Sequence, residues 1–397
     1  MKKIKRIVLL VVAVLVLLVA ASGVKTVLDM KNSADNEVQE EDSTRWAEPT
    51  SDPLSLEGIA DASAKYASAA VNGSLNLVFN GIWSRQTDYF TVPGGSLTIT
   101  GYGTLDGQGS YWWTRQRAGQ NAHPRPYLVC FNHCEHVTLE NVTLTNSPAW
   151  TVHPLYCRNV VIRGLNIKNP ADSPNTDGID PDGCQDVRIH DCTIDVGDDC
   201  IAIKSGTEDT PNRQVCERII ISNCHFLHGH GGVVLGSEMS GGIRNVVVSS
   251  CVFYETDRGI RLKTRRGRGG TVEGIQLNNL VMEKVMCPFV FNMYYFCGAN
   301  GKMKHVWDKA PYPVTDATPC LRDVVISDVR ARQCTACAGF FYGLAEMPVE
   351  GVKMQNVVVE MVDGASGRPA MMDGCPEMQR AGFYLRNAAD VDLRGVA

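Results

Sequence analysis

A short pattern of alternating apolar and polar residues recurs along most of the chain and limits what it can fold into. Each unit reads apolar-x-apolar-x, then one Asn, Asp, Gly or Ser, then apolar-x-apolar. The units are Val137–Leu144, Val160–Ile167, Val187–Ile194, Ile219–Phe226, Val246–Phe253, Ile275–Met282, Val324–Ala331 and Val352–Val359. Alternation with period two predicts β-strands rather than helices, so each unit is interpreted as strand, turn and strand.

The spacing of the units predicts how they pack. Their turn residues are Asn141, Gly164, Asp191, Asn223, Ser250, Asn279, Asp328 and Asn356. These follow one another at 23 to 32 residues, apart from one step of 49 that contains an expected loop, Asn300–Pro319. Such residues tolerate a left-handed backbone, and stacking the units as parallel strands buries a continuous core. The sequence therefore predicts an all-β fold, a single right-handed parallel β-helix. A leucine-rich repeat is the alternative, but its signature is absent.

The first thirty residues read as a targeting segment. Lys2, Lys3, Lys5 and Arg6 precede an apolar run from Ile7 to Ala21, with small residues at its end. The run is shorter than the roughly 20 residues that span a bilayer comfortably, which favours a signal peptide. An uncleaved membrane anchor is the alternative, because no clean Ala-x-Ala is present. Either reading predicts an exported protein, secreted or tethered to a membrane.

The rest of the chain divides simply. Residues 31–53 are polar and acidic and predict a disordered linker. Residues 54–397 form the β-helix domain, whose repeats are clearest over 97–359. The alanine-rich stretch Ile59–Val71 is compatible with a short helix capping the solenoid. At the other end Val391 begins a further unit, so either the chain is truncated there or its last coil is incomplete.

The net charge and the cysteine content limit which partners and which disulfides can be expected. The formal charge of −5 gives no reason to expect nucleic acid. The 15 cysteines of an exported chain suggest disulfides. However, Cys192, Cys224 and Cys251 occupy equivalent positions of successive units, where stacked apolar thiols are the simpler interpretation. Cys334 and Cys337 have no second pair at zinc spacing, so a local disulfide or free thiols are expected there. We expect a monomer.

The strand that follows each unit carries the polar residues of interest. Aligning Ile179, Ile201, Val233 and Ile260 as one row places residues of equal register about 4.8 Å apart on neighbouring strands. Two positions earlier the row reads Asp177, Asp199, Gly231 and Arg258, and three positions earlier it reads Thr176, Asp198, His230 and Asp257. Arg261 and Lys263 follow on the last strand and face the same side. The alignment predicts one site built by several coils.

Clustered carboxylates favour acid–base chemistry. Like charges this close raise the pKa of at least one carboxyl, which leaves a protonated acid beside ionised carboxylates, as glycoside hydrolysis requires. The less specific interpretations stay open. Asp182, Asp186 and Asp191 are interpreted as turn residues, and Asp180 as either a site residue or a turn residue. The weakest alternative is that the clustered aspartates bind calcium. Lys204 fits a substrate contact or a structural ion pair equally well, and Arg265–Arg268 reads rather as a solvated loop than as a substrate contact.

Four motifs in this order resemble glycoside hydrolase family 28, the polygalacturonase family. They are Asn175-Thr-Asp177-Gly, Gly197-Asp198-Asp199, Gly229-His230-Gly231 and Arg261-Leu262-Lys263. Tyr102–Gly109, Trp112-Trp113, Arg125-Pro126 and Ser147–Trp150 support the resemblance, which covers about Leu97 to Val359. Residues 57–94 do not read like the opening of the family, so the first coils are expected to be missing, degenerate or replaced.

The resemblance implies inverting hydrolysis of α-1,4 bonds in a pectic polygalacturonate substrate, without a metal or other cofactor. By it Asp198 is the general acid, Asp177 and Asp199 hold and activate the attacking water, and His230 tunes the protonation of the acid. Arg261 and Lys263 bind the galacturonate carboxylate. The other substrate-binding residues expected are Asn175, Lys204 and Tyr295, with Tyr294 in reserve. Inversion predicts an acid–base separation of about 6.5–9.5 Å between Asp198 and Asp177.

Other functions remain as alternatives. One is a non-catalytic β-helix that binds acidic polysaccharide, although three aspartates would repel such a ligand. Another is a pectate lyase, which requires calcium. A rhamnogalacturonan or xylogalacturonan hydrolase is the nearest alternative within the hydrolases. The inserted segments Thr207–Gln214 and Asn300–Pro319 favour exo over endo action, if they block one end of the site.

Overall fold

The computed structural model describes residues 67–69, 74–79, 82–84, 96–121, 124–298 and 300–397. The expected targeting segment, the linker, and most of the possible helix Ile59–Val71 lie outside these ranges. Within that last stretch Ala67–Ala69 forms strand β1, antiparallel to β2, rather than helix. Among the described residues, no helix has both the length and the apolar character needed to cross a membrane.

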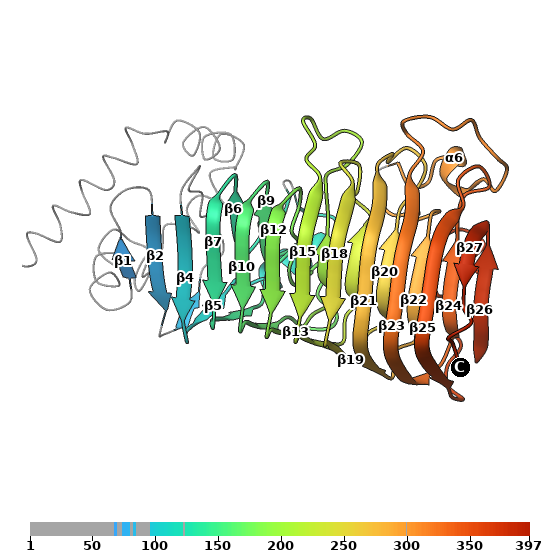
Figure 1. Ribbon diagram of the computed structural model, residues 1–397. Helices are drawn as coiled ribbons and strands as arrows, with labels where there is room; N and C mark the ends of the chain where they lie inside the picture. Colours follow the sequence, from blue (N-terminus) through green and yellow to red (C-terminus); the bar gives the residue numbers. More distant parts are fainter. Residues whose placement is uncertain (1–66, 70–73, 80–81, 85–95, 122–123, 299) are drawn as a thin grey trace, which may run out of the picture.

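The coils stack into one elongated parallel solenoid, as the repeat predicts (Figure 1). The first strand of each coil belongs to one long sheet, and a short strand follows it after a turn. The first strands are β2 (Ser74–Phe79), β4 (Ser96–Gly101), β7 (Glu135–Glu140), β10 (Arg158–Arg163), β12 (Gln185–His190), β15 (Cys216–Ser222), β18 (Ile243–Ser249), β21 (Thr271–Glu283), β23 (Cys320–Cys334), β25 (Val349–Met361) and β27 (Ala388–Asp392). The short strands are β3 (Ile82–Ser84), β5 (Thr104–Asp106), β8 (Thr143–Thr145), β11 (Asn166–Lys168), β13 (Thr193–Asp195), β16 (His225–Leu227) and β19 (Val252–Tyr254).

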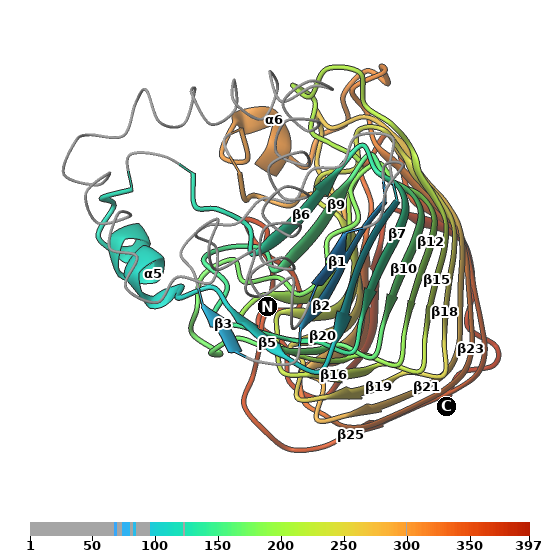
Figure 2. The same ribbon diagram turned by 90° about the vertical axis from the view of Figure 1, so that its left-hand side faces the viewer.

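A second parallel sheet carries the strands that close each coil. Its strands are β6 (Val129–Asn132), β9 (Val152–Leu155), β14 (Asp199–Ile203), β17 (Gly231–Gly236), β20 (Arg258–Lys263), β22 (Cys287–Asn292), β24 (Cys337–Tyr342) and β26 (Ala381–Arg386). Single bridges at Ile179 and Asp182 join β9 to β14. The helices among the described residues, α5 (Ser110–Arg117) and α6 (Lys304–Trp307), lie on the side of this second sheet (Figure 2).

The repeat positions coincide in space. Val137, Val160, Val187 and Ile219 are direct neighbours in the first sheet, and the same row continues through the later units to Val352 and Val391. The eight predicted turn residues all have positive φ, between 52° and 62°. Asn, Asp and Gly suit that left-handed backbone because its steric cost is lowest for them. The parallel pairing of β2 with β4 shows that the sheet extends at least one strand before Leu97.

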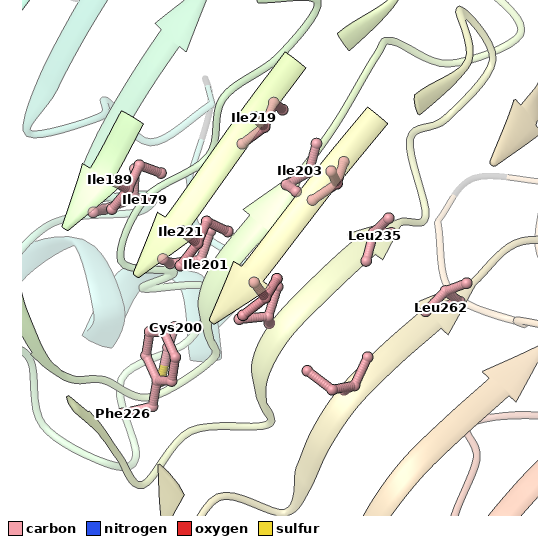
Figure 3. Packing of buried hydrophobic residues seen from close by; sticks show 14 of the residues in the cluster. Ile179, Ile189, Cys200, Ile201, Ile203, Ile219, Ile221, Phe226, Leu235 and Leu262 are labelled. Atoms are coloured by element: carbon pink, nitrogen blue, oxygen red, sulfur yellow. The ribbon is translucent and has the colours of Figure 1, made fainter. Parts of the chain in front are cut away.

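Apolar side chains fill the inside of every coil. Figure 3 shows Ile179 beside Ile189 and Ile201 beside Ile221, so residues of the second-sheet side meet residues of the first sheet, and Leu235 follows farther along the second sheet. All five are fully buried. Burying a side chain of this size stabilises the folded state by about 1.5–3 kcal/mol relative to leaving it exposed. Cys192, Cys224 and Cys251 are buried free thiols, in agreement with the stacked-core interpretation. Cys334 and Cys337 are also free, and the sulfur of Cys337 lies 3.2 Å from that of Cys287 on the neighbouring coil.

Candidate active site

The polar residues of the predicted site lie together on the outer face of the second sheet. Ile179 pairs with Ile201, Ile201 with Val233, and Val233 with Ile260, which is the alignment assumed from the sequence. The strand after them is also in the expected register, because Ile260 pairs with Phe289. Consecutive coils therefore deliver the aspartates, the histidine and the cations to one place.

Three carboxyl groups form the centre of the site. Asp177, Asp198 and Asp199 each place one carboxylate oxygen within 4.8 Å of the others. The expected separation of about 6.5–9.5 Å between Asp198 and Asp177 is therefore wrong for their nearest oxygens. The reason is the coil spacing: Asp177 is in register with Asp199 on the adjacent strand, and Asp198 directly precedes Asp199 in the chain, so all three carboxyl groups lie close together. One water molecule can still touch two such oxygens at the usual distance of about 2.7–2.8 Å.

Asp199 is held as an anion by two cations. Its carboxylate oxygens lie 2.6 Å from Lys263 Nζ and 3.2 Å from Arg261 Nη1, and all three side chains are buried. Burial disfavours the charged form of Asp199, but the charges of Lys263 and Arg261 outweigh it and lower the pKa of this carboxyl far below its usual value. Arg261 Nη2 has no hydrogen-bond partner among the described residues.

Asp177 has the opposite environment. It is buried, and burial together with the charges of Asp198 and Asp180 raises its pKa well above the usual value, although Lys204 opposes the shift. Asp180 is fully buried, and within the described part of the chain neither of its oxygens accepts a hydrogen bond. Its pKa is raised as well, by burial first and against the charge of Lys204, 3.4 Å away. Asp180 thus belongs to the charge cluster rather than to an exposed turn.

Asp198 is the most accessible of the three central carboxyl groups. Its side chain is 18% exposed, against 6% for Asp177 and none for Asp199. One oxygen of Asp198 lies 3.3 Å from His230 Nδ1, and the other accepts a hydrogen bond from Asn175 Nδ2 at 3.4 Å. The hydrogen bond with Asp198 raises the pKa of His230, although partial burial opposes the shift.

A glycine beside His230 keeps room for this arrangement. A Cβ atom at Gly231 would lie 3.1 Å from an oxygen of Asp199 and only 2.5 Å from a methyl of Val234. A larger residue would therefore have to displace the side chain of Val234 and would crowd the carboxylate of Asp199.

Lys204 is buried among carboxylates. Its ammonium lies 3.4 Å from Asp180, 4.0 Å from Asp177 and 3.3 Å from Glu238, and it also sits over the ring of Trp150 at 4.3 Å. Burial lowers the pKa of Lys204, but the carboxylates outweigh it and raise the pKa. The structure thus gives Lys204 the structural ion pair that was one of its two expected roles.

Tyr295 lies where a substrate contact was expected. Its ring centre is 5.5 Å from the guanidinium of Arg261 and 5.1 Å from Lys263 Nζ. Burial raises its pKa to about 12, so the phenol is neutral near pH 7. Tyr294 points elsewhere, under Arg266 and Lys309.

The prediction of a solvated Arg265–Arg268 loop is wrong. The three arginines in it are between 2% and 6% exposed. Arg265 and Arg268 both pair with Glu208 of the Thr207–Gln214 segment, and Arg266 pairs with Glu346 at 2.5 Å. Arg266 also donates to the carbonyls of three residues of the α6 segment, His305, Asp308 and Ala310. These cations hold loops together, which no repeat pattern could reveal.

Three residues near the site were not predicted to be part of it. Arg125 donates to Asn175 Oδ1 at 2.6 Å and so orients the amide that contacts Asp198. Glu238 pairs with Lys204, and Arg258 lies at the start of the strand that carries Arg261. The only sequence signals were the Arg125-Pro126 pair and the alignment of Arg258 with Asp199.

The three central carboxylates could in principle hold a cation. Lys263 and Arg261 already neutralise Asp199, so a metal ion would compete with two buried cations for that ligand.

Most of the chain is similar to known proteins. Residues 84–377 match the family model of the glycosyl hydrolases family 28. A probable polygalacturonase of Vitis vinifera is 37% identical over 281 residues, which cover 69% of this chain and 54% of that protein. The chain thus spans about half the length of the curated relatives it matches.

Solved structures share the fold. A polygalacturonase of Erwinia carotovora superposes with a TM-score of 0.58 at 24% identity, covering 83% of this chain and 79% of the other. An exopolygalacturonase of Thermotoga maritima gives 0.56 at 24% identity, covering 81% and 75%. The parallel β-helix is therefore confirmed.

Proposed function

The chain belongs to family 28 of the glycosyl hydrolases, and from this we propose that it hydrolyses α-1,4-galacturonosidic bonds of pectic polygalacturonate. One observation carries the proposal: three carboxyl groups with different environments meet within 4.8 Å of one another beside a buried pair of cations. Hydrolysis of a glycosidic bond requires an acid and a water-activating carboxylate. Curated relatives named as polygalacturonases support the choice of substrate.

In the proposed reaction Asp198 donates a proton to the glycosidic oxygen as its bond to the anomeric carbon breaks. Its exposure supports this role, because the acid must touch the substrate. A water between Asp177 and Asp199 attacks the anomeric carbon and gives its proton to Asp177. The raised pKa of Asp177 makes it the better base of the two, whereas Asp199 stays an anion and accepts a hydrogen bond from the water.

Arg261, Lys263 and Tyr295 are proposed to bind the sugar next to the cleaved bond. The partnerless Nη2 of Arg261 supports this, since a buried guanidinium N–H gains most from a carboxylate partner. Asn175 and Lys204 act within the protein in this proposal: Asn175 orients Asp198, and Lys204 balances the charge of Asp177 and Asp180. His230 holds Asp198 from the other side.

The stereochemical part of the proposal is inversion, so the first product carries the β configuration. The short distance between the carboxylates is closer to the spacing typical of retaining enzymes, about 5–5.5 Å between carboxyl groups. The water bridging two oxygens is what reconciles inversion with that spacing. We further propose that the enzyme cleaves at chain ends (exo action) rather than within the polymer (endo action). Secretion, or tethering outside the cytoplasm, is proposed from the basic and apolar first thirty residues.

The test is purified protein acting on polygalacturonate, with Asp198→Asn as control. The proposal expects new reducing ends, a β-anomer as the first product in proton NMR, full activity with EDTA, and no ultraviolet absorbance from unsaturated sugars. Unsaturated products or a loss of activity with EDTA would indicate a lyase. Binding without turnover would indicate a non-catalytic polysaccharide-binding protein. Turnover only on rhamnogalacturonan or xylogalacturonan would change the substrate, and an α-anomer would replace inversion by retention.

A further inference from the structure

The segment between β25 and β26 leaves its own coil and contacts residues of earlier coils. Residues 364–378, here called the strap, form a long hairpin-like loop. Gly367 and Met378 close its base with two reciprocal backbone hydrogen bonds of 2.9 Å. Both ends of the strap lie near Thr335: a Cβ atom at Gly364 would contact it, and the Arg380 amide donates to its carbonyl at 2.7 Å.

One side of the strap is fixed at the beginning of β20. Arg258 Nε donates to the carbonyl of Pro369, and Nη2 to that of Arg368, both at 2.9 Å. Arg258 is only 8% exposed. It starts the strand that carries Arg261 and Lys263. The strap therefore reaches back from the last coils to the strand of the cation pair.

The other side is fixed at the end of β22. The carbonyl of Met371 accepts a hydrogen bond from the Phe296 amide at 3.3 Å and from Asn292 Nδ2 at 3.4 Å. Asn292 is the direct neighbour of Lys263 in the sheet. Residues 369–371 of the strap thus accept hydrogen bonds from a side chain at the start of β20 and from a side chain at the end of β22, which places this part of the strap over the outer face of the sheet between them.

Burial agrees with this path. Ala370, Met372 and Cys375 of the strap are between 4% and 8% exposed. Val290 and Phe340 continue the row of Arg261 on β22 and β24 and alternate with the core residues Phe289 and Phe341. They belong to the outer face, and yet both are fully buried.

On the N-terminal side of the site the outer face of the second sheet carries partly exposed aromatic rings. Beyond Asp177 it runs through β9 and β6, where Trp150 and Tyr127 stack with ring centres 5.1 Å apart and an angle of 10°. Both side chains are only partly buried. Lys204 also lies over the Trp150 ring, so Tyr127 is the ring of this pair that we expect to meet the apolar face of a sugar.

We propose that the strap ends the substrate-binding face just beyond Arg261 and Lys263, so that the sugar bound by these cations is the terminal one. The polymer continues in the opposite direction, over β9 and β6. The enzyme then releases short products from one chain end. This inference rests on the proposed function, since it assigns a direction and an end to the same substrate.

The first experiment uses the wild-type protein and a pentagalacturonate that carries a bulky fluorophore at one end or at the other. The strap predicts hydrolysis of the untagged pentamer and of one tagged form, with the other tagged form lost as a substrate. Equal hydrolysis of both tagged forms overturns the inference. No hydrolysis of the untagged pentamer overturns the proposed function instead.

The second experiment replaces residues 368–375 by Gly-Ser-Gly, which keeps the Gly367–Met378 base. Wild type is expected to give only monomers or dimers early in the digestion of polygalacturonate, with a slow loss of viscosity. The shortened strap is expected to give a ladder of oligomers and a severalfold larger viscosity loss per bond cleaved. A ladder from wild type, or unchanged short products from a shortened variant with native circular dichroism, contradicts the proposal. If the variant does not fold, the tagged pentamers decide.

Discussion

Asp177 and Asp199 share one space on adjacent coils, and the protein treats their carboxyl groups in opposite ways. Asp199 lies 2.6 Å from Lys263 and 3.2 Å from Arg261, which lower its pKa in spite of burial. Asp177 is buried with Asp198 and Asp180 nearby and only Lys204, at 4.0 Å, in opposition, and its pKa is raised. One carboxylate is thereby fixed as an anion while the other is a stronger base than usual.

This difference predicts opposite effects of two isosteric substitutions on stability. A raised pKa means that ionising Asp177 costs folding free energy once the pH rises above its usual value of 3.8, and that the cost grows up to the raised pKa. Asp177→Asn is therefore expected to raise the melting temperature at pH 7 and to have little effect below pH 3.8.

Asp199 contributes stability in the other pH range. Its contribution is present above the usual pKa of 3.8 and is lost as the pH falls through the lowered pKa. Asp199→Asn leaves two buried cations without their partner and is expected to cost about 3–5 kcal/mol at pH 7. Unfolding by heat and by denaturant at neutral and acidic pH measures both variants. Shifts in the same direction at pH 7 would contradict the assigned environments.

Asp198→Asn is expected to abolish turnover and to keep the fold. The amide has the same shape and can still contact Asn175 or His230, but it cannot donate a proton to the leaving oxygen. General acid catalysis typically contributes about 10²–10⁴-fold, so kcat should fall at least that far.

Asp191→Asn is the matched control, because Asp191 is a turn residue with φ of 58° that asparagine also tolerates. Release of reducing ends measures both variants. If Asp198→Asn keeps more than a few per cent of the activity, the acid must be another group, and buried Asp177 with its raised pKa is the next candidate.

His230 is expected to set the alkaline limit of activity. Its hydrogen bond with Asp198 raises its pKa above the usual 6.5, so this interaction is complete below pH 6.5 and is lost as the pH rises through the raised pKa. His230→Gln should lower kcat and remove or shift the alkaline limb of the pH–rate profile.

His228→Gln provides the comparison for that profile. His228 lies on the same turn but bridges Asp195 and Glu255 instead of contacting the site. Its replacement should leave the alkaline limb in place. An unchanged limb in His230→Gln would exclude the assigned role of His230.

The fork of Arg261 is expected to distinguish charged from esterified substrates. Arg261→Lys keeps the positive charge but loses the partnerless Nη2 that is proposed to meet the galacturonate carboxylate. A hydrogen bond to a charged group contributes about 1.5–3 kcal/mol, so kcat/KM on polygalacturonate should fall about tenfold to a hundredfold. On fully methyl-esterified pectin the loss should be much smaller.

Arg265→Lys is the control for this prediction, because Arg265 is an equally buried arginine that pairs with Glu208. It should change kcat/KM similarly on both substrates. Equal losses on both substrates in Arg261→Lys would mean that the guanidinium acts only through Asp199.

The repeat made the fold and the register of the site predictable. The left-handed turn at Asn223 and the pairing of Ile201 with Val233 follow from local residue chemistry and from a fixed number of residues per coil. Side chains that project directly from this lattice, such as Asp199 and Lys263, could be placed for the same reason.

What the repeat could not predict depends on contacts between loops of different coils. The burial of Arg266 is decided by carbonyls of the α6 segment and by Glu346, 80 residues away. The path of the strap is decided by Arg258, some 110 residues earlier in the chain. The distance between Asp177 and Asp198 is shorter than the general rule for inverting enzymes predicts, because the spacing of the coils sets it.

The closed base of the strap at Gly367 and Met378 has an evolutionary consequence. An excursion that leaves and rejoins a coil at one point can change in length or sequence while the coils keep their backbone pairing, provided that buried Arg258 finds new hydrogen-bond partners. The groups proposed to transfer protons, Asp177 and Asp198, by contrast, lie just before paired residues of the second sheet and are held in place by that pairing. On the proposal that the strap ends the substrate-binding face, a lineage built on this scaffold can alter which part of a polymer it attacks while inheriting the reaction unchanged.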